Sequence, residues 1–205
     1  MLTLISFPRS GRNWLCLLLD VYHGGPVFNN RLNNPSHPDS KDLIGKYIHD
    51  HKANKKINGK ILYIWRNPVD VIFSMLNQKT IYIKKDRQLH TEQDKVVVWT
   101  NRWINHMNKW LVPQYERIHY VKYEQLQLNP IITLAETISF IWPEDTVSVF
   151  RCEATVTGVT KSFVDKVCHE SNAIVPYTKE DKKMFTTCYS DMILDAIPQE
   201  IKRFL

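Results

Sequence analysis

The feature of the sequence that most constrains the fold lies at its start, in residues 2–22. A short apolar run with β-branched residues, Leu2 to Phe7, predicts a buried strand. The turn that follows holds a proline, a glycine and two arginines, and from Trp14 onward apolar residues predict a helix. N–H groups at a helix start carry the positive end of the helix dipole. Residues 7–14 are therefore predicted to bind an anion.

Further apolar segments predict more strands. Ile61–Trp65 is uninterrupted in its apolar character, which is typical of a parallel strand that is buried on both faces. Ile118–Tyr123 predicts another strand, and Gly45–His49 is compatible with either a strand or a short helix.

Between these segments, apolar residues recur at the spacing of three and four that is typical of helices. Asn67 is expected to cap a helix that starts at Pro68, and Thr178 with Asp181 resembles a capping box. Two short helices are expected within residues 145–176. Further helices are predicted over residues 94–111 and from Pro130 onward.

Strands that alternate with helices indicate the α/β class. We expect a single domain over residues 1–205, with a central parallel sheet and helices on both of its faces, in a three-layer α/β/α arrangement. A chain of 205 residues is long enough to bury roughly 70% of its unfolded surface, so it needs no disulfide or metal to fold.

Composition narrows the classes of ligand and the compartment. The net charge of +6 favours anionic ligands without indicating nucleic acid. The cysteines are far apart and form no CxxC pair, which indicates reduced thiols rather than a disulfide framework or a metal site. No apolar run approaches the roughly 18 residues of a membrane span, and no signal peptide precedes the first strand, so a cytoplasmic protein is expected.

A second motif follows the apolar run that ends at Trp65. Arg66 leaves the carboxyl end of this predicted strand, and Ser74 comes two helical turns later. Ligands of open α/β sheets bind outside the carboxyl ends of the strands. A guanidinium group supplies bidentate charged hydrogen bonds and a serine supplies a neutral one. This pair suits a phosphate monoester, although an Arg-Asn-Pro segment can also be no more than a capped helix start.

The first motif has the layout of a nucleotide-triphosphate loop but not its residues. Such a loop ends in Gly-Lys-Ser/Thr, whose lysine binds the terminal phosphates and whose hydroxyl binds Mg²⁺. Here Arg12 and Asn13 stand where that hydroxyl is expected. A kinase-like, nucleotide-dependent phosphotransferase is thus an alternative that the residues disfavour.

Together the two motifs resemble the signatures of sulfotransferases that use 3′-phosphoadenosine 5′-phosphosulfate (PAPS). Phe7–Trp14 fits the family pattern [YF]-P-[KR]-S-G-x-x-W, and Arg66–Ser74 fits R-[ND]-P-x-D-x-x-x-S. Trp99–Leu111 is similar to the family's W…HxxxWL helix, with His106 in place, and Val121–Pro130 to its V-x-Y-E-D-L…xP segment. The resemblance covers roughly residues 1–142 and implies a P-loop-NTPase-like sulfotransferase fold.

The resemblance also implies the site residues. It assigns the 3′-phosphate to Arg66 and Ser74, and it places Trp14 and Tyr123 against the nucleotide. No metal is required, because the cations come from the protein itself. The residues that it assigns to the 5′-phosphosulfate are Arg9, Ser10, Gly11, Arg12, Asn13 and Trp14.

Departures from the family pattern shift some of these roles. Many members carry lysine at the position of Arg9, and a guanidinium group cannot give up its proton, so Arg9 is expected to stabilise charge as a catalytic residue without acting as an acid. The family's histidine base corresponds best to His49, which precedes Asp50, with His51 as the other candidate. The family's R-K-G segment is absent, and Arg151 and Lys161 are the cations in that region, neither of them assigned to the 3′-phosphate.

The resulting prediction is an enzyme that moves a sulfuryl group in line from PAPS to an acceptor hydroxyl, releasing 3′-phosphoadenosine 5′-phosphate (PAP). Its partner is a small-molecule or carbohydrate-type acceptor, and neither nucleic acid nor a membrane span is expected. The sequence leaves the acceptor and the oligomeric state open. A catalytically inactive nucleotide-binding module is the other alternative, because the C-terminal third departs most from the family.

Overall fold

The computed structural model describes residues 2–25, 27, 45–48, 59–77, 91–113, 115–170 and 177–205, with the backbone alone at 45–48 and 160–170. The chain divides into two compact units. The first consists of Met1–Trp65 and Tyr115–His169, and the second of Arg66–Gln114 and Glu170–Leu205. A single sulfotransferase-type domain over residues 1–205 stays a prediction.

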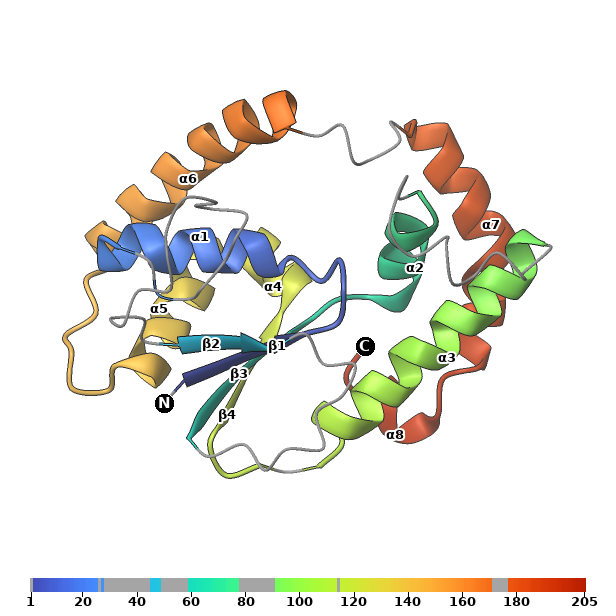
Figure 1. Cartoon of the computed structure of the whole chain (residues 1–205), viewed down its shortest axis with the longest axis horizontal. Helices are drawn as coiled ribbons and strands as arrows, with labels where there is room; N and C mark the ends of the chain where they lie inside the picture. Colours follow the sequence, from blue (N-terminus) through green and yellow to red (C-terminus); the bar gives the residue numbers. More distant parts are fainter. Residues whose placement is uncertain are drawn as a thin grey trace. The chain divides into compact units, whose positions relative to one another are not determined.

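The first unit contains a parallel sheet. Its strands are β1 (Leu2–Ser6), β2 (Gly45–Ile48), β3 (Lys60–Trp65) and β4 (Ile118–Lys122), in the order β2-β1-β3-β4 (Figure 1). Every neighbouring pair is parallel. The predicted α/β class with a parallel sheet is confirmed, and the segment that the sequence left open at 45–49 forms a strand.

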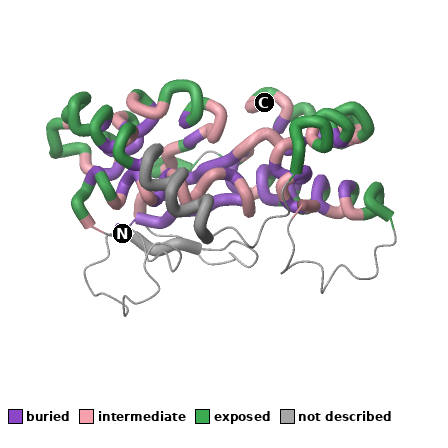
Figure 2. The backbone as a smooth tube through the Cα atoms, turned by 90° about the horizontal axis from the view of Figure 1, so that it is seen from above, coloured by how far each residue is buried: buried purple, intermediate pink, exposed green. Residues whose placement is uncertain are grey.

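Strands β1 and β3 are buried on both faces, as the apolar runs predicted. Successive side chains of a strand point to opposite faces. Leu4 and Leu62 point to one face, Ile5 and Tyr63 to the other, and all four have no exposed surface. Figure 2 draws such buried positions in purple along the backbone.

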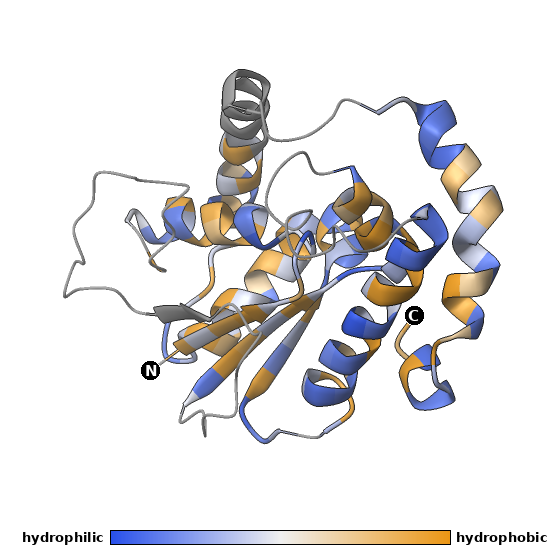
Figure 3. Cartoon of the chain, turned by 45° about the vertical axis from the view of Figure 1, so that its right-hand side comes forward, coloured by the Kyte–Doolittle hydropathy of each residue, from blue (hydrophilic) through white to orange (hydrophobic). Residues whose placement is uncertain are grey.

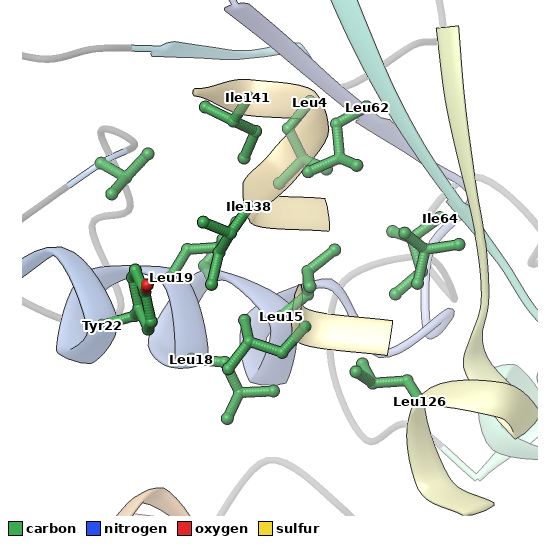
Figure 4. Packing of buried hydrophobic residues seen from close by; sticks show 14 of the residues in the cluster. Leu4, Leu15, Leu18, Leu19, Tyr22, Leu62, Ile64, Leu126, Ile138 and Ile141 are labelled. Atoms are coloured by element: carbon green, nitrogen blue, oxygen red, sulfur yellow. The ribbon is translucent and has the colours of Figure 1, made fainter. Parts of the chain in front are cut away.

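One face of the sheet carries the apolar core of the first unit. Helix α1 (Arg12–His23) supplies Leu15, Leu18 and Leu19, and helix α5 (Pro130–Ile141) supplies Ile138 and Ile141 (Figure 4). Burial of each such side chain stabilises the fold by about 1.5–3 kcal/mol. This core also takes in Leu2, Leu4, Leu62, Ile64 and Val121 of the strands, Leu126 of helix α4 (Tyr123–Leu128), and Cys152 and Val159 of helix α6 (Val149–Glu170).

The second unit is helical. It contains α2 (Pro68–Leu76), α3 (Glu92–Trp110), α7 (Lys179–Asp195) and α8 (Gln199–Lys202). Phe73 of α2 packs its ring against Tyr177 and Phe185, with centroids 4.8 and 5.1 Å away. These contacts hold the start of α7 against α2.

The helix signals in the sequence of this unit are confirmed. Asn67 Oδ1 accepts a hydrogen bond from the Val69 N–H at 2.9 Å and caps α2. Thr178 and Asp181 form the predicted capping box of α7. In Figure 3, which is coloured by hydropathy, hydrophobic and hydrophilic residues alternate along α3. Within the described ranges, no helix has the length and apolar character needed to cross a membrane.

Two predictions about secondary structure are wrong. Residues 149–170 form one long helix, α6, rather than two short ones. Its many valines and threonines have low helix propensity, which hid it in the sequence, whereas packing of Cys152 and Val159 into the core favours it. The strand predicted at Ile118–Tyr123 ends one residue earlier, at Lys122, and Tyr123 opens α4 with Lys122 as its N-cap.

Candidate functional site

The loop that joins β1 to α1 has an unusual backbone. Arg9 has φ 67° and Gly11 has φ 83°, so both lie in the left-handed region, while Ser10 between them does not. The Ser10 N–H donates to the Phe7 carbonyl at 3.3 Å and closes the turn. In a turn that contains left-handed residues, successive N–H groups can form a concave anion-binding surface.

The conformation of Arg9 is costly. A left-handed backbone costs a residue with a side chain roughly 1–2 kcal/mol, whereas glycine adopts it freely. Such strain persists where the surrounding structure enforces it, and it concentrates at functional sites. The strained position of this loop therefore coincides with the arginine that the sequence assigned to catalysis.

Ser10 supplies the second observation at this loop. The residue is fully buried, and within the described part of the chain its Oγ has no hydrogen-bond partner. A buried hydroxyl without a partner costs about 1–3 kcal/mol, so a ligand oxygen that accepted from it would stabilise the protein. The loop thus fits an anionic group.

The first turn of α1 adds positive charge beside the loop. Gly11 is the N-cap and supplies no side-chain cap, and the first turn holds no acidic residue. The Arg12 guanidinium donates to Asn13 Oδ1 from Nε at 3.0 Å and from Nη2 at 2.9 Å, which fixes its orientation. The helix dipole and the guanidinium group have the same sign here and both favour an anion.

Tyr123 shapes this loop from the start of α4. A Cβ atom placed on Gly11 would lie 2.1 Å from Tyr123 Cδ2, so the ring occupies the space of any side chain at this position. Tyr123 also meets Trp14 edge to face, with ring centroids 6.0 Å apart and an interplanar angle of 71°. The two aromatic residues that the sequence placed against the nucleotide are thus in contact with each other and with the loop.

Cys16, one turn beyond Arg12, is a packing residue. It is buried in the core, and burial raises the pKa of its thiol to about 12, although the Arg12 charge acts in the opposite direction. Its thiol is neutral at physiological pH and is a poor nucleophile. Cys16, Cys152 and Cys188 are free cysteines in the part of the chain that the structure describes.

The second motif lies in the second unit. Arg66 directly follows the last residue of β3, and its Nη2 lies 3.5 Å from Asp70 Oδ2. Asp70 and Ser74 are one helical turn apart on α2, so their side chains share one face of this helix. The motif therefore presents a cation, a carboxylate and a hydroxyl along one side of α2.

One charged partner in this group, Lys182, could not be predicted from the sequence. Lys182 of α7 places its Nζ 2.6 Å from Asp70 Oδ1. A lysine that pairs with a carboxylate more than 100 positions away leaves no periodic or local signal in a single sequence. The only related signal in the sequence is the capping box at the start of α7, because it predicts where the helix that carries Lys182 begins.

Arg151 has a structural role at the far end of α1. Its Nη2 donates to the Tyr22 carbonyl, and its guanidinium carbon lies over the Tyr22 ring, 4.6 Å from the ring centroid. A helix of 12 residues is about 18 Å long. Arg151 is therefore remote from the loop at Arg9–Gly11. His49, His51 and the side chain of Lys161 lie outside the described residues, so their predicted roles are untested.

Comparison with known proteins agrees with the two motifs. The family model of the sulfotransferase domain matches residues 2–144, well over half of the chain. Among curated proteins, none matches. The crystal structure of mouse sulfotransferase SULT7A1 complexed with PAP superposes with a TM-score of 0.53 and 17% identity, over 98% of this chain and 77% of that chain. The chain therefore belongs to the sulfotransferase family and has its α/β fold.

Proposed function

We propose that this sulfotransferase uses PAPS as its sulfuryl donor and transfers the sulfuryl group to the hydroxyl of a small-molecule or carbohydrate-type acceptor. The loop Phe7–Trp14 carries the proposal, because its strained Arg9 and its buried Ser10 hydroxyl are suited to an anionic group. The description of SULT7A1 as a complex with PAP supports the same choice of nucleotide.

At the 5′ end of the donor, the loop and the start of α1 hold the phosphosulfate. Gly11 lets the backbone N–H groups approach the ligand closely, and the Ser10 hydroxyl donates to a phosphate or sulfonate oxygen. Arg9 and Arg12 supply the positive charge, while Asn13 orients Arg12 through its amide oxygen. Preorganised donors of this kind stabilise charge that develops in the transition state.

At the 3′ end, Arg66 and Ser74 bind the 3′-phosphate. The guanidinium group forms charged hydrogen bonds with the phosphate oxygens, and the serine hydroxyl adds a neutral one. Trp14 and Tyr123 supply flat apolar surface for the adenine ring.

Sulfuryl transfer needs a general base for the acceptor hydroxyl, but it needs no general acid from the loop Phe7–Trp14. His49 accepts the proton of the acceptor hydroxyl while the hydroxyl oxygen bonds to sulfur. The bond between sulfur and the bridging phosphate oxygen breaks, and its electron pair stays on that oxygen. Arg9 and Arg12 stabilise this charge electrostatically, since a guanidinium group keeps its proton at working pH.

Binding of two nucleotides tests the donor. We expect the protein to bind PAP more tightly than AMP, which lacks the 3′-phosphate, in calorimetric titrations. Arg66→Ala should weaken PAP binding about tenfold to a hundredfold, because hydrogen bonds to charged groups contribute about 1.5–3 kcal/mol. Ser74→Ala should have a smaller effect of about fivefold. Arg102→Ala, the same change of charge on α3, is the matched control.

The same titrations separate the alternatives. Equal affinity for PAP and AMP in the wild type would refute the role of Arg66 and Ser74. A phosphotransferase would bind ATP and need Mg²⁺, whereas sulfuryl transfer should persist in EDTA. Tight PAP binding without transfer to any acceptor in a broad panel would favour the inactive nucleotide-binding module.

Histidine substitutions test the base. His49→Ala should lower the transfer rate by about 10²–10⁴, the range of general base catalysis, and leave PAP affinity unchanged. His51→Ala is the matched control, two positions away and with the same loss of an imidazole. If His51→Ala lost the rate and His49→Ala kept it, the base would be His51.

A further inference from the structure

Two cationic side chains lie around one carboxylate of the second unit, that of Asp70. Lys182 Nζ lies 2.6 Å from Asp70 Oδ1, and Arg66 Nη2 lies 3.5 Å from Asp70 Oδ2. The two cations come from segments far apart in the sequence, the end of β3 and the first turns of α7. Asp70 therefore bridges a cation of the sulfotransferase motif and a cation that lies beyond residues 2–144, the part matched by the family model.

The two ion pairs are unequal. The distance from Lys182 to Asp70 is about 0.9 Å shorter than the distance from Arg66 to Asp70 (3.5 minus 2.6 Å). Electrostatic attraction between opposite charges weakens as this distance grows. Arg66 and Asp70 are the less exposed partners, with 20% and 26% of their side-chain surface accessible, against 44% for Lys182. Asp70 thus has Lys182 as its closer counter-ion, and Arg66 lies on the opposite carboxylate oxygen at a longer distance.

This geometry has a consequence for a ligand phosphate. The three groups carry a net charge of +1, whereas Arg66 and Asp70 alone would carry none. A carboxylate next to a phosphate site repels the phosphate and competes with it for the guanidinium group. A lysine that neutralises the carboxylate removes both effects.

The position of Lys182 is well defined by the start of α7. The Lys182 N–H donates to the Thr178 carbonyl at 3.3 Å, and Thr178 forms the capping box with Asp181. Phe185, one turn further on, packs against Phe73 of α2. The helix that carries Lys182 is therefore anchored to the helix that carries Asp70.

We propose that Lys182 is a positioning residue of the 3′-phosphate site, which holds the Asp70 carboxylate and thereby keeps the charge of Arg66 for the ligand. The inference rests on the proposed function, since it concerns the phosphate that Arg66 is proposed to bind. It gives helix α7 a part in donor recognition.

A charge-restoration experiment tests this role. Affinities for PAP and for AMP are measured by calorimetry at one low salt concentration for wild type, Lys182→Ala, Lys182→Arg, Asp70→Asn/Lys182→Ala and Lys183→Ala. Lys182→Ala should weaken PAP binding about fivefold, the size expected of a partly exposed ion pair, without changing AMP binding. Lys182→Arg should stay close to wild type. Lys183, an exposed neighbour on the same helix, is the matched control.

The double variant is the decisive measurement. Asp70→Asn/Lys182→Ala again carries a net charge of +1 and has no carboxylate to compete for Arg66, so PAP affinity should return to near the wild-type value. Thermal unfolding confirms that each variant is folded.

Each other result overturns the inference. Unchanged PAP affinity in Lys182→Ala would show that Asp70 does not compete with the ligand. A loss that Asp70→Asn does not restore would show that Lys182 acts in some other way. Equal binding of PAP and AMP by the wild type would instead refute the proposed donor, and the role of Lys182 with it.

Discussion

Gly11→Ala is expected to lower the rate of sulfuryl transfer about a hundredfold, because a displacement of about 1 Å at a reacting group can cost this much. Two effects combine at this position. Gly11 has φ 83°, which an alanine adopts only with strain, and the new Cβ would lie 2.1 Å from Tyr123 Cδ2. The loop must move to relieve the contact, and the Arg9 and Ser10 groups must move with it.

Gly24→Ala is the matched control. Gly24 also has φ 83°, but nothing lies within 4 Å of its Cβ position, so alanine there adds strain without a steric conflict. It should lower the free energy of unfolding by about 1–2 kcal/mol and leave the transfer rate unchanged. Urea unfolding and initial rates with PAPS measure both variants. A Gly11→Ala enzyme with the wild-type rate would contradict the assignment of this loop to the donor.

Tyr123→Ala in the Gly11→Ala background separates the two causes. Removing the ring eliminates the steric conflict and keeps the backbone strain. Part of the lost rate should return if the conflict is the main cause, and Tyr123→Ala alone shows how much the missing ring costs. No recovery would mean that the strain at Gly11 accounts for the whole effect.

The local features of this chain could be predicted from its sequence because neighbouring residues determine them. The apolar run Ile61–Trp65 is buried in strand β3, and Asn67 caps the helix that the sequence predicted from Pro68. The motif at Phe7–Trp14 was likewise identified from residue types and their order. Each of these depends on spacing within a few positions.

The features that could not be predicted from the sequence depend on contacts between segments that are far apart in the chain. The Tyr123 ring that fills the space beside Gly11 and the Lys182 that pairs with Asp70 arise only when separate elements pack together. Helix α6 was missed for a related reason, since burial of its apolar side outweighs the low helix propensity of its valines and threonines. The charge of Arg151 was the only reason to consider it for the 3′-phosphate. Its contact with Tyr22 shows that it instead packs against the end of α1.

Arg9→Gly is expected to lower the transfer rate by about 10²–10³, the usual loss when one group that stabilises transition-state charge is removed. The same change should leave the free energy of unfolding unchanged or raise it by up to about 1 kcal/mol, because glycine adopts the φ of 67° without strain but loses more backbone entropy on folding. Loss of activity without loss of stability is the expected signature of a residue that is held in a strained conformation for its chemistry.

A set of three substitutions at this position separates charge from backbone. Arg9→Ala loses the same side chain as Arg9→Gly but keeps the strained backbone of the wild type, so it should share the loss of rate and have a free energy of unfolding close to that of the wild type, up to about 1 kcal/mol below that of Arg9→Gly. Arg9→Lys keeps the charge and should retain most of the rate. The three rates, measured at saturating PAPS, test the charge, and the three unfolding free energies test the strain. An Arg9→Gly enzyme with the wild-type rate would mean that the backbone N–H groups and Arg12 stabilise the transferring group without Arg9.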